Sequence, residues 1–228
     1  MNNQLANLPF YLPIVFFACI VFTYYMFYKA TRCSKPFLWL AFGWIVIQGV
    51  LAKTGFYMAF DSMPPRFLLA VGPPVFTIIL LFTTAKGKAF IAQLDLKILI
   101  VLHSVRIAVE FCLLWLFLAK AIPQLMTFEG RNFDILAGIT APVVYYLFFV
   151  KKAISNHVYL VWNIAGFLLL MSVVVHAFLS APFPFQQLAF NQPNIGVLYF
   201  PYILLPSFIV PLVLFSHLVA IKRWREAS

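Results

Sequence analysis

Seven long runs of apolar residues, separated by short polar connections, make up almost the whole chain. Most of these runs reach the length of about 17–25 residues that an α-helix needs to cross the hydrocarbon of a bilayer. None shows the alternation over about ten residues that marks a transmembrane β-strand. The pattern therefore predicts an all-α protein, a single transmembrane bundle of seven helices over residues 1–228. The predicted helices are 8–28, 37–60, 67–85, 96–122, 135–150, 158–181 and 195–221.

Composition excludes a water-soluble fold. The chain is 64% hydrophobic and only 10% charged, whereas soluble domains average about 45–50% apolar and about 25% charged residues. A soluble protein of this composition would expose large apolar patches. The first expected partner is therefore the lipid bilayer itself.

Most of the basic residues lie on one side of the predicted bundle, in short connections and the C-terminal tail. This placement explains the formal charge of +10 by membrane orientation, so no nucleic-acid partner is expected. The positive-inside rule then places the N-terminus outside and the C-terminus in the cytoplasm. The basic positions on the cytoplasmic side are Lys29, Arg32, Lys35, Lys86, Lys88, Lys97, Lys151, Lys152, Lys222, Arg223 and Arg225.

The fourth run carries ionisable residues in its first half. At about 100° per residue, His103, Arg106 and Glu110 fall within roughly 60° of one another, so they share one helix face. A charge at bilayer depth costs a few kcal/mol or more unless it faces protein, water or a partner. This face is therefore expected to point into the bundle.

Depths calculated from the helical rise group further polar residues with this face. Lys53, Glu110, His176 and Tyr202 are expected in one outer-middle layer, with Arg106 and Gln48 just beneath. This grouping predicts a polar cavity, open to the outside, between the second, fourth, sixth and seventh helices. The candidate ligand-binding residues are Arg106, Glu110, Lys53, His176, Tyr202, His103 and Gln48.

Each of these residues also has a structural interpretation. Arg106 and Glu110 are four residues apart and could pair with each other as a clip within the helix. Lys53 either extends to the membrane surface or pairs with Glu110. His176 is either a hydrogen-bonded interfacial histidine or a ligand, and His217 is expected near the cytoplasmic surface in contact with solvent.

No metal site and no cofactor is predicted. His103 and His176 differ in expected depth by about 15 Å, so one haem cannot bind both. The chain contains no H-x-x-x-H or H-E-x-x-H sequence, and its three cysteines have no metal-type spacing.

The segment EGRNFD, residues 129–134, is the densest polar stretch outside the runs. Asp134 is placed to cap the start of the fifth helix, and Glu129 and Arg131 to form a surface pair. The alternative is functional, because the segment directly follows the fourth helix. In that case Glu129, Arg131 and Asp134 would line the mouth of the outward cavity.

Two stretches, HSVRIAVE from His103 to Glu110 and MTFEGRNFD from Met126 to Asp134, resemble sequences of uncharacterised bacterial integral membrane proteins with seven helices. The resemblance extends over most of the chain. It implies a bacterial inner (cytoplasmic) membrane and brings no known activity.

The leading functional hypothesis is binding or translocation of a small solute or ion through the outward-facing cavity. Arg106, Lys53 and Glu110 carry a net charge of +1 when all are ionised, which favours a small anionic solute. One alternative is a membrane-embedded enzyme acting on a lipid or quinone, with Glu110 or His103 as acid or base, so the question of enzymatic activity stays open. Another is a receptor or scaffold with a purely structural polar core. Oligomeric state is not predicted.

Overall fold

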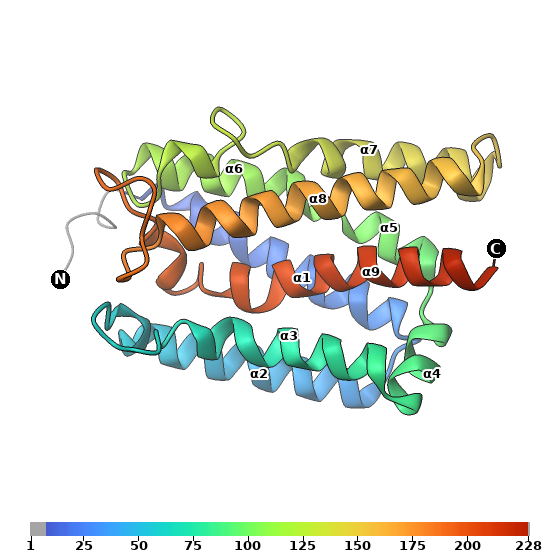
Figure 1. Ribbon diagram of the computed structural model, residues 1–228, viewed down its shortest axis with the longest axis horizontal. Helices are drawn as coiled ribbons and strands as arrows, with labels where there is room; N and C mark the ends of the chain where they lie inside the picture. Colours follow the sequence, from blue (N-terminus) through green and yellow to red (C-terminus); the bar gives the residue numbers. More distant parts are fainter. Residues whose placement is uncertain (1–7, 228) are drawn as a thin grey trace.

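The computed structural model describes residues 8–227, which fold into helices without a β-strand. Most of the helices lie side by side along the long axis of the molecule (Figure 1). The α-helices are α1 Tyr11–Ala30, α2 Lys35–Lys53, α3 Leu68–Thr83, α4 Ala85–Gln93, α5 Leu96–Leu102, α6 Val105–Leu118, α7 Ile135–Tyr145, α8 Asn156–Ser180 and α9 Val210–Ala227. The shorter elements are the 3₁₀ turns η1 Phe56–Met58, η2 Gln124–Met126 and η4 Gly196–Leu198, and the π-helices η3 Tyr146–Val150 and η5 Leu205–Ile209.

Several helices are long and apolar enough to cross a membrane. Within the described residues five meet this condition, and α3 with α4 makes a sixth if the pair, bent by 93°, is counted as one span. The segment Ile135–Val150, which combines α7 and η3, is apolar but shorter. The five are Tyr11–Ala30, Lys35–Lys53, Leu96–Leu118, Asn156–Ser180 and Leu205–Glu226. An all-helical chain with several membrane-compatible helices is therefore confirmed.

The predicted last helix begins later than expected. Residues 195–204 form the turn η4 and irregular structure, and regular helix follows only from η5 onward. Pro201 lies in this irregular part and Pro206 at the start of η5, and both lack the backbone N–H that a helix interior needs. Hydropathy alone could not show this, because the segment is apolar whether or not it is helical.

The bundle has an apolar outer surface and polar residues inside. Leu40, Trp39 and Val161 are exposed by 71%, 69% and 64%, whereas Arg106 and Glu110 are exposed by only 3% and 2%. This distribution is the reverse of that in a water-soluble protein. It suits a solvent of lipid chains, in which large apolar side chains face outward at no cost.

The α5–α6 rod packs against both α1 and α7 (Figure 1). Its two helices are separated by a turn at His103 and Ser104. There the backbone makes tighter i→i+3 bonds, from Arg106 N–H to the His103 carbonyl and from Ile107 N–H to the Ser104 carbonyl. The polar face of this rod thus begins at a local break in the helix.

Candidate functional site

Arg106 lies at the centre of a buried polar cluster. Its Nε forms an ion pair with Asp134 Oδ2 at 2.8 Å, and its Nη2 donates to the Gly166 carbonyl at 3.1 Å. Its Nη1 lies 3.2 Å from His217 Nε2. One guanidinium therefore joins α6 to α8, to α9 and to the residue that precedes α7.

The partners of His217 determine its protonation. Arginine can only donate, so His217 Nε2 accepts from Arg106 Nη1. His217 Nδ1 lies 3.1 Å from Asn163 Oδ1, an acceptor, so Nδ1 carries the proton and the ring is neutral. Asn163 in turn donates from Nδ2 to the Tyr159 carbonyl at 2.9 Å. The ring of His103 stacks on that of His217 with centroids 3.9 Å apart.

Asn132 connects the Glu110 carboxylate to the backbone of Asp134. Its side-chain Nδ2 donates to Glu110 Oε1 at 2.6 Å and to the Met126 carbonyl at 3.0 Å. Its Oδ1 accepts from the backbone N–H of Asp134 at 3.0 Å. The loop before α7 is thereby fixed over α6, with Glu110 and Asp134 held on either side of one amide.

Charge within the cluster is unbalanced. One guanidinium and two carboxylates leave a net charge of −1 when all three are ionised and the histidines are neutral. Glu110 Oε2 and Asp134 Oδ1 are buried and have no hydrogen-bond partner among the described residues. Buried polar atoms are normally hydrogen-bonded, and buried charges are normally paired. The cluster can therefore accept one positive charge, as a proton on a carboxylate or as a bound cation.

Two glycines allow the helices to approach this closely. A Cβ atom on Gly166 would lie 2.6 Å from the His217 ring, and one on Gly138 would lie 3.0 Å from the backbone nitrogen of Ile107 and 3.1 Å from Arg106 Cβ. Small residues at helix crossings permit such backbone approach in membrane bundles. Gly166 also brings its carbonyl within reach of the Arg106 guanidinium.

Four of the predicted site residues belong to the cluster: His103, Arg106, Glu110 and Asp134. The predicted Arg106–Glu110 clip is wrong, because the ion pair of Arg106 is with Asp134. Asp134 occupies the N-cap position of α7, but its side chain makes no capping hydrogen bond. Its carboxylate instead neutralises Arg106, a stronger interaction for a buried charge than a helix cap.

The other predicted residues lie elsewhere. Lys53 is exposed at the end of α2, with Nζ 4.7 Å from the centroid of the Phe200 ring. His176 is bonded within its own helix, with Nδ1 2.7 Å from the Ser172 carbonyl. Tyr202 is buried and packs on Phe16, with ring centroids 5.1 Å apart. Glu129 and Arg131 are exposed, outside the cluster.

Gln48 makes a buried contact of its own, since its Oε1 accepts a hydrogen bond from the Tyr57 hydroxyl. Replacing Tyr57 with phenylalanine should leave this oxygen without its partner and destabilise the protein by about 1–3 kcal/mol. Denaturation in detergent should show the loss. Tyr25→Phe is the matched control, because Tyr25 is 53% exposed, and it should change the stability little. Equal effects of the two variants would contradict this prediction.

Three cluster residues were not predicted as site residues: Asn132, Asn163 and His217. The expectation that His217 contacts solvent is wrong, because its exposure is 0%. The helix α9 continues to Ala227, and α8 packs along it, so His217 lies inside the bundle. A usable signal was the position of His217 on the same side of α9 as Val213, four residues earlier, which is buried.

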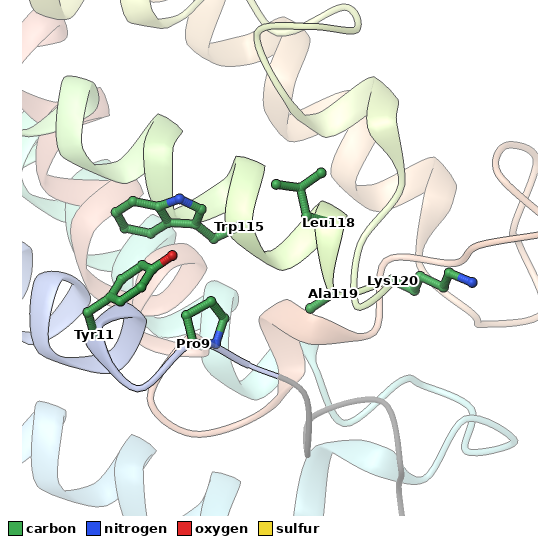
Figure 2. A pocket seen from close by; sticks show the side chains of 6 residues that line it. All are labelled: Pro9, Tyr11, Trp115, Leu118, Ala119 and Lys120. Atoms are coloured by element: carbon green, nitrogen blue, oxygen red, sulfur yellow. The ribbon is translucent and has the colours of Figure 1, made fainter.

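A separate pocket lies between the start of α1 and the end of α6 (Figure 2). It has a volume of about 320 Å³. The Tyr11 and Trp115 rings form one side of it, with their centroids 4.8 Å apart. The pocket shares no residue with the cluster, and the remaining lining residues are Pro9, Leu118, Ala119 and Lys120.

The fold and the cluster together define an all-helical protein whose apolar helices could cross a membrane and enclose a buried, partly unpaired set of charges. Residues 64–225 match the model of a family described as a domain of unknown function (DUF8737), and the chain belongs to this family. The matched region contains every residue of the cluster, whereas α1 and α2 precede it. No curated protein and no solved structure matches the chain.

Proposed function

We propose that the chain spans a bacterial inner membrane seven times, with its N-terminus outside. One end of the bundle, here named the basic end, supports this orientation. The carbonyl of Ala30 accepts from the Asp95 backbone N–H, and that of Leu94 accepts from Arg223, so the end of α1, the start of α5 and the end of α9 lie together. Lys29, Lys97 and Lys222 belong to these three segments, and such a concentration of lysines is expected of the cytoplasmic face. The shorter α7–η3 segment would span with the help of Lys151, whose Nζ lies 5.8 Å from the Tyr146 ring centroid.

Within this membrane, we propose that the protein translocates a small solute or ion, with a cation as the transported or coupled species. The observation that carries the proposal is that the cluster buries two carboxylates, Glu110 and Asp134, but only one guanidinium, which pairs with Asp134. The sequence favoured an anion because Lys53 was counted with Arg106 and Glu110. With Asp134 in the cluster and Lys53 outside it, the net charge of the ionised site changes from +1 to −1. The smallest cation that satisfies the cluster is a proton, and chains of acidic and histidine side chains within membrane helices are typical of proton pathways.

Glu110 is the proposed proton carrier. Asp134 is committed to Arg106, whereas the hydrogen bond to Glu110 comes from a neutral amide. Protonation of Glu110 makes the cluster neutral, and loss of that proton leaves one negative charge in a low-dielectric site. The proton would bind Glu110 with different affinity in two conformations of the bundle. Because a ligand shifts a conformational equilibrium only through such a difference in affinity, protonation of Glu110 would favour one conformation. His217 and His103 then continue the polar pathway from Arg106 toward the basic end.

Proton movement in vesicles tests this function. Purified protein is reconstituted with a pH-sensitive dye inside, and a potassium diffusion potential drives protons inward, with and without a mixed pool of small solutes outside. Wild type should acidify the lumen faster than empty vesicles, and Glu110→Gln should reduce the excess rate at least tenfold. Glu129→Gln, a change to an exposed carboxylate in the neighbouring loop, should behave like wild type.

Two outcomes would reject the proposal. One is a wild-type rate equal to that of empty vesicles under both conditions. The other is a Glu110→Gln rate equal to wild type. Thermal unfolding of each variant checks that it is folded, so that loss of transport is not mistaken for loss of structure. The alternative of an enzyme acting on a lipid or quinone stays a prediction.

A further inference from the structure

A second pocket lies at the basic end of the bundle, away from the buried cluster. It has a volume of about 410 Å³ and is formed by the start of α5, the end of η3, the following connection and the start of α8. Its lining residues are Lys97, Phe148, Phe149, Lys152, Ile154 and Asn156. Two cations and an apolar wall thus face the same space.

The charges of this pocket are available to a ligand. Lys97 and Lys152 are both exposed, and neither forms an ion pair within residues 8–227. The acid closest to Lys97 in the sequence is Asp95, whose Oδ1 accepts from the backbone N–H of Lys97 as a cap of α5. Lys152 lies in the connection between η3 and α8, where its backbone has a φ of 51°, a conformation that is uncommon outside glycine. The local field is therefore positive.

The apolar wall is held together by ring stacking. The ring of Phe148 stacks on Tyr159 with centroids 4.3 Å apart and an interplanar angle of 3°, and Phe149 meets Phe148 edge-on at 4.8 Å. Tyr159 is itself buried against Ile100. An apolar group entering the pocket would meet a preformed aromatic surface rather than mobile side chains.

An exposed apolar stripe runs along the α7–η3 segment, whose last residues also line this pocket. Its residues are spaced by three or four positions along α7 and η3, and each is about half exposed. The stripe ends directly beside Phe148 and Phe149 in the chain. Its members are Leu136, Ile139, Val143, Tyr146 and Val150. An acyl chain can lie along such a stripe while its headgroup reaches the lysines.

We propose that this pocket binds the headgroup of an anionic phospholipid from the surrounding bilayer. The phosphate contacts Lys97 and Lys152, and the glycerol region packs on Phe148 and Phe149. The start of α8 adds a favourable dipole, since its first turn contains no acidic residue. Basic pockets between membrane helices bind anionic headgroups through the same combination of charge and apolar contact. The site is independent of the buried cluster.

Native mass spectrometry of the full chain in a non-ionic detergent tests the site. The probes are dioleoyl phosphatidylglycerol and dioleoyl phosphatidylcholine. The pocket variant is Lys97→Gln with Lys152→Gln, and the matched control is Lys86→Gln with Lys88→Gln, which removes two exposed lysines of α4. Affinity for phosphatidylglycerol should fall roughly thirtyfold in the pocket variant and by less than about twofold in the control. Binding of phosphatidylcholine should be weak and equal in all proteins.

Three results would overturn the proposal. Equal losses in the two double variants would mean that the lysines attract anions without a defined site. No loss in the pocket variant would place lipid binding elsewhere. Displacement of phosphatidylglycerol by millimolar inorganic phosphate or glycerol phosphate would identify a site for a free phosphate instead of a lipid. Thermal unfolding of both variants checks that each is folded.

Discussion

Replacing Asp134 with asparagine is expected to destabilise the protein by about 3–5 kcal/mol, because it leaves the Arg106 guanidinium buried without its counter-ion. The two remaining contacts, to the Gly166 carbonyl and the His217 ring, are with neutral groups and cannot replace a charge. Arginine does not lose its proton in proteins, so the positive charge persists. Chemical denaturation in detergent should show this loss directly.

The matched control is Asp61→Asn, which changes an exposed aspartate and should alter the stability by less than about 0.5 kcal/mol. The double variant Arg106→Met with Asp134→Leu separates two explanations. If the unpaired charge causes the loss, removing both charges should restore much of the stability, since apolar replacement of a buried ion pair is often neutral. A double variant that is less stable than both single variants would contradict this explanation.

Replacing Gly166 with alanine is expected to destabilise the protein by about 2–4 kcal/mol, from overpacking together with weakened hydrogen bonds. The added methyl group would lie 2.6 Å from the His217 ring. The ring must then move away from Arg106 and from Asn163, to which it is bonded on its other side. Thermal and chemical unfolding both measure the effect.

Gly43→Ala in α2 is the control for the same substitution in open space. A Cβ atom there would meet nothing within 4 Å. Alanine is favoured over glycine inside a helix by about 1 kcal/mol, so Gly43→Ala should stabilise the protein slightly. Opposite signs at the two glycines would support the close approach of α8 to α9. A stabilising Gly166→Ala would show that this approach does not restrict the site.

The helices could be predicted because their signal is local. The length of an apolar run can be measured in the sequence without knowing what the helix packs against. The helices α1, α2, α6 and α8 therefore lie within or close to the predicted runs. The late start of the last helix was missed for the same reason, since an apolar segment at residues 195–204 reads the same whether it is helical or irregular.

The partners of Arg106 could not be predicted, because they are set by packing between distant segments. Helical spacing pointed to Glu110, four residues away. In the structure Asn132 holds Glu110, and close packing at Gly138 brings the start of α7 to α6 so that Asp134 reaches the guanidinium. Depth estimates from straight helices likewise placed His217 at the surface, since they do not include the packing of α8 against α9.

The three-way coordination of Arg106 also sets an order of events during synthesis. Its partners Gly166 and His217 lie 60 and 111 residues further along the chain. At about 5–20 residues per second, His217 leaves the ribosome roughly 6–22 s after Arg106. During that interval the Arg106 guanidinium lacks its hydrogen-bond partner on α9. The α5–α6 segment therefore completes its buried polar contacts only after the last helix is made.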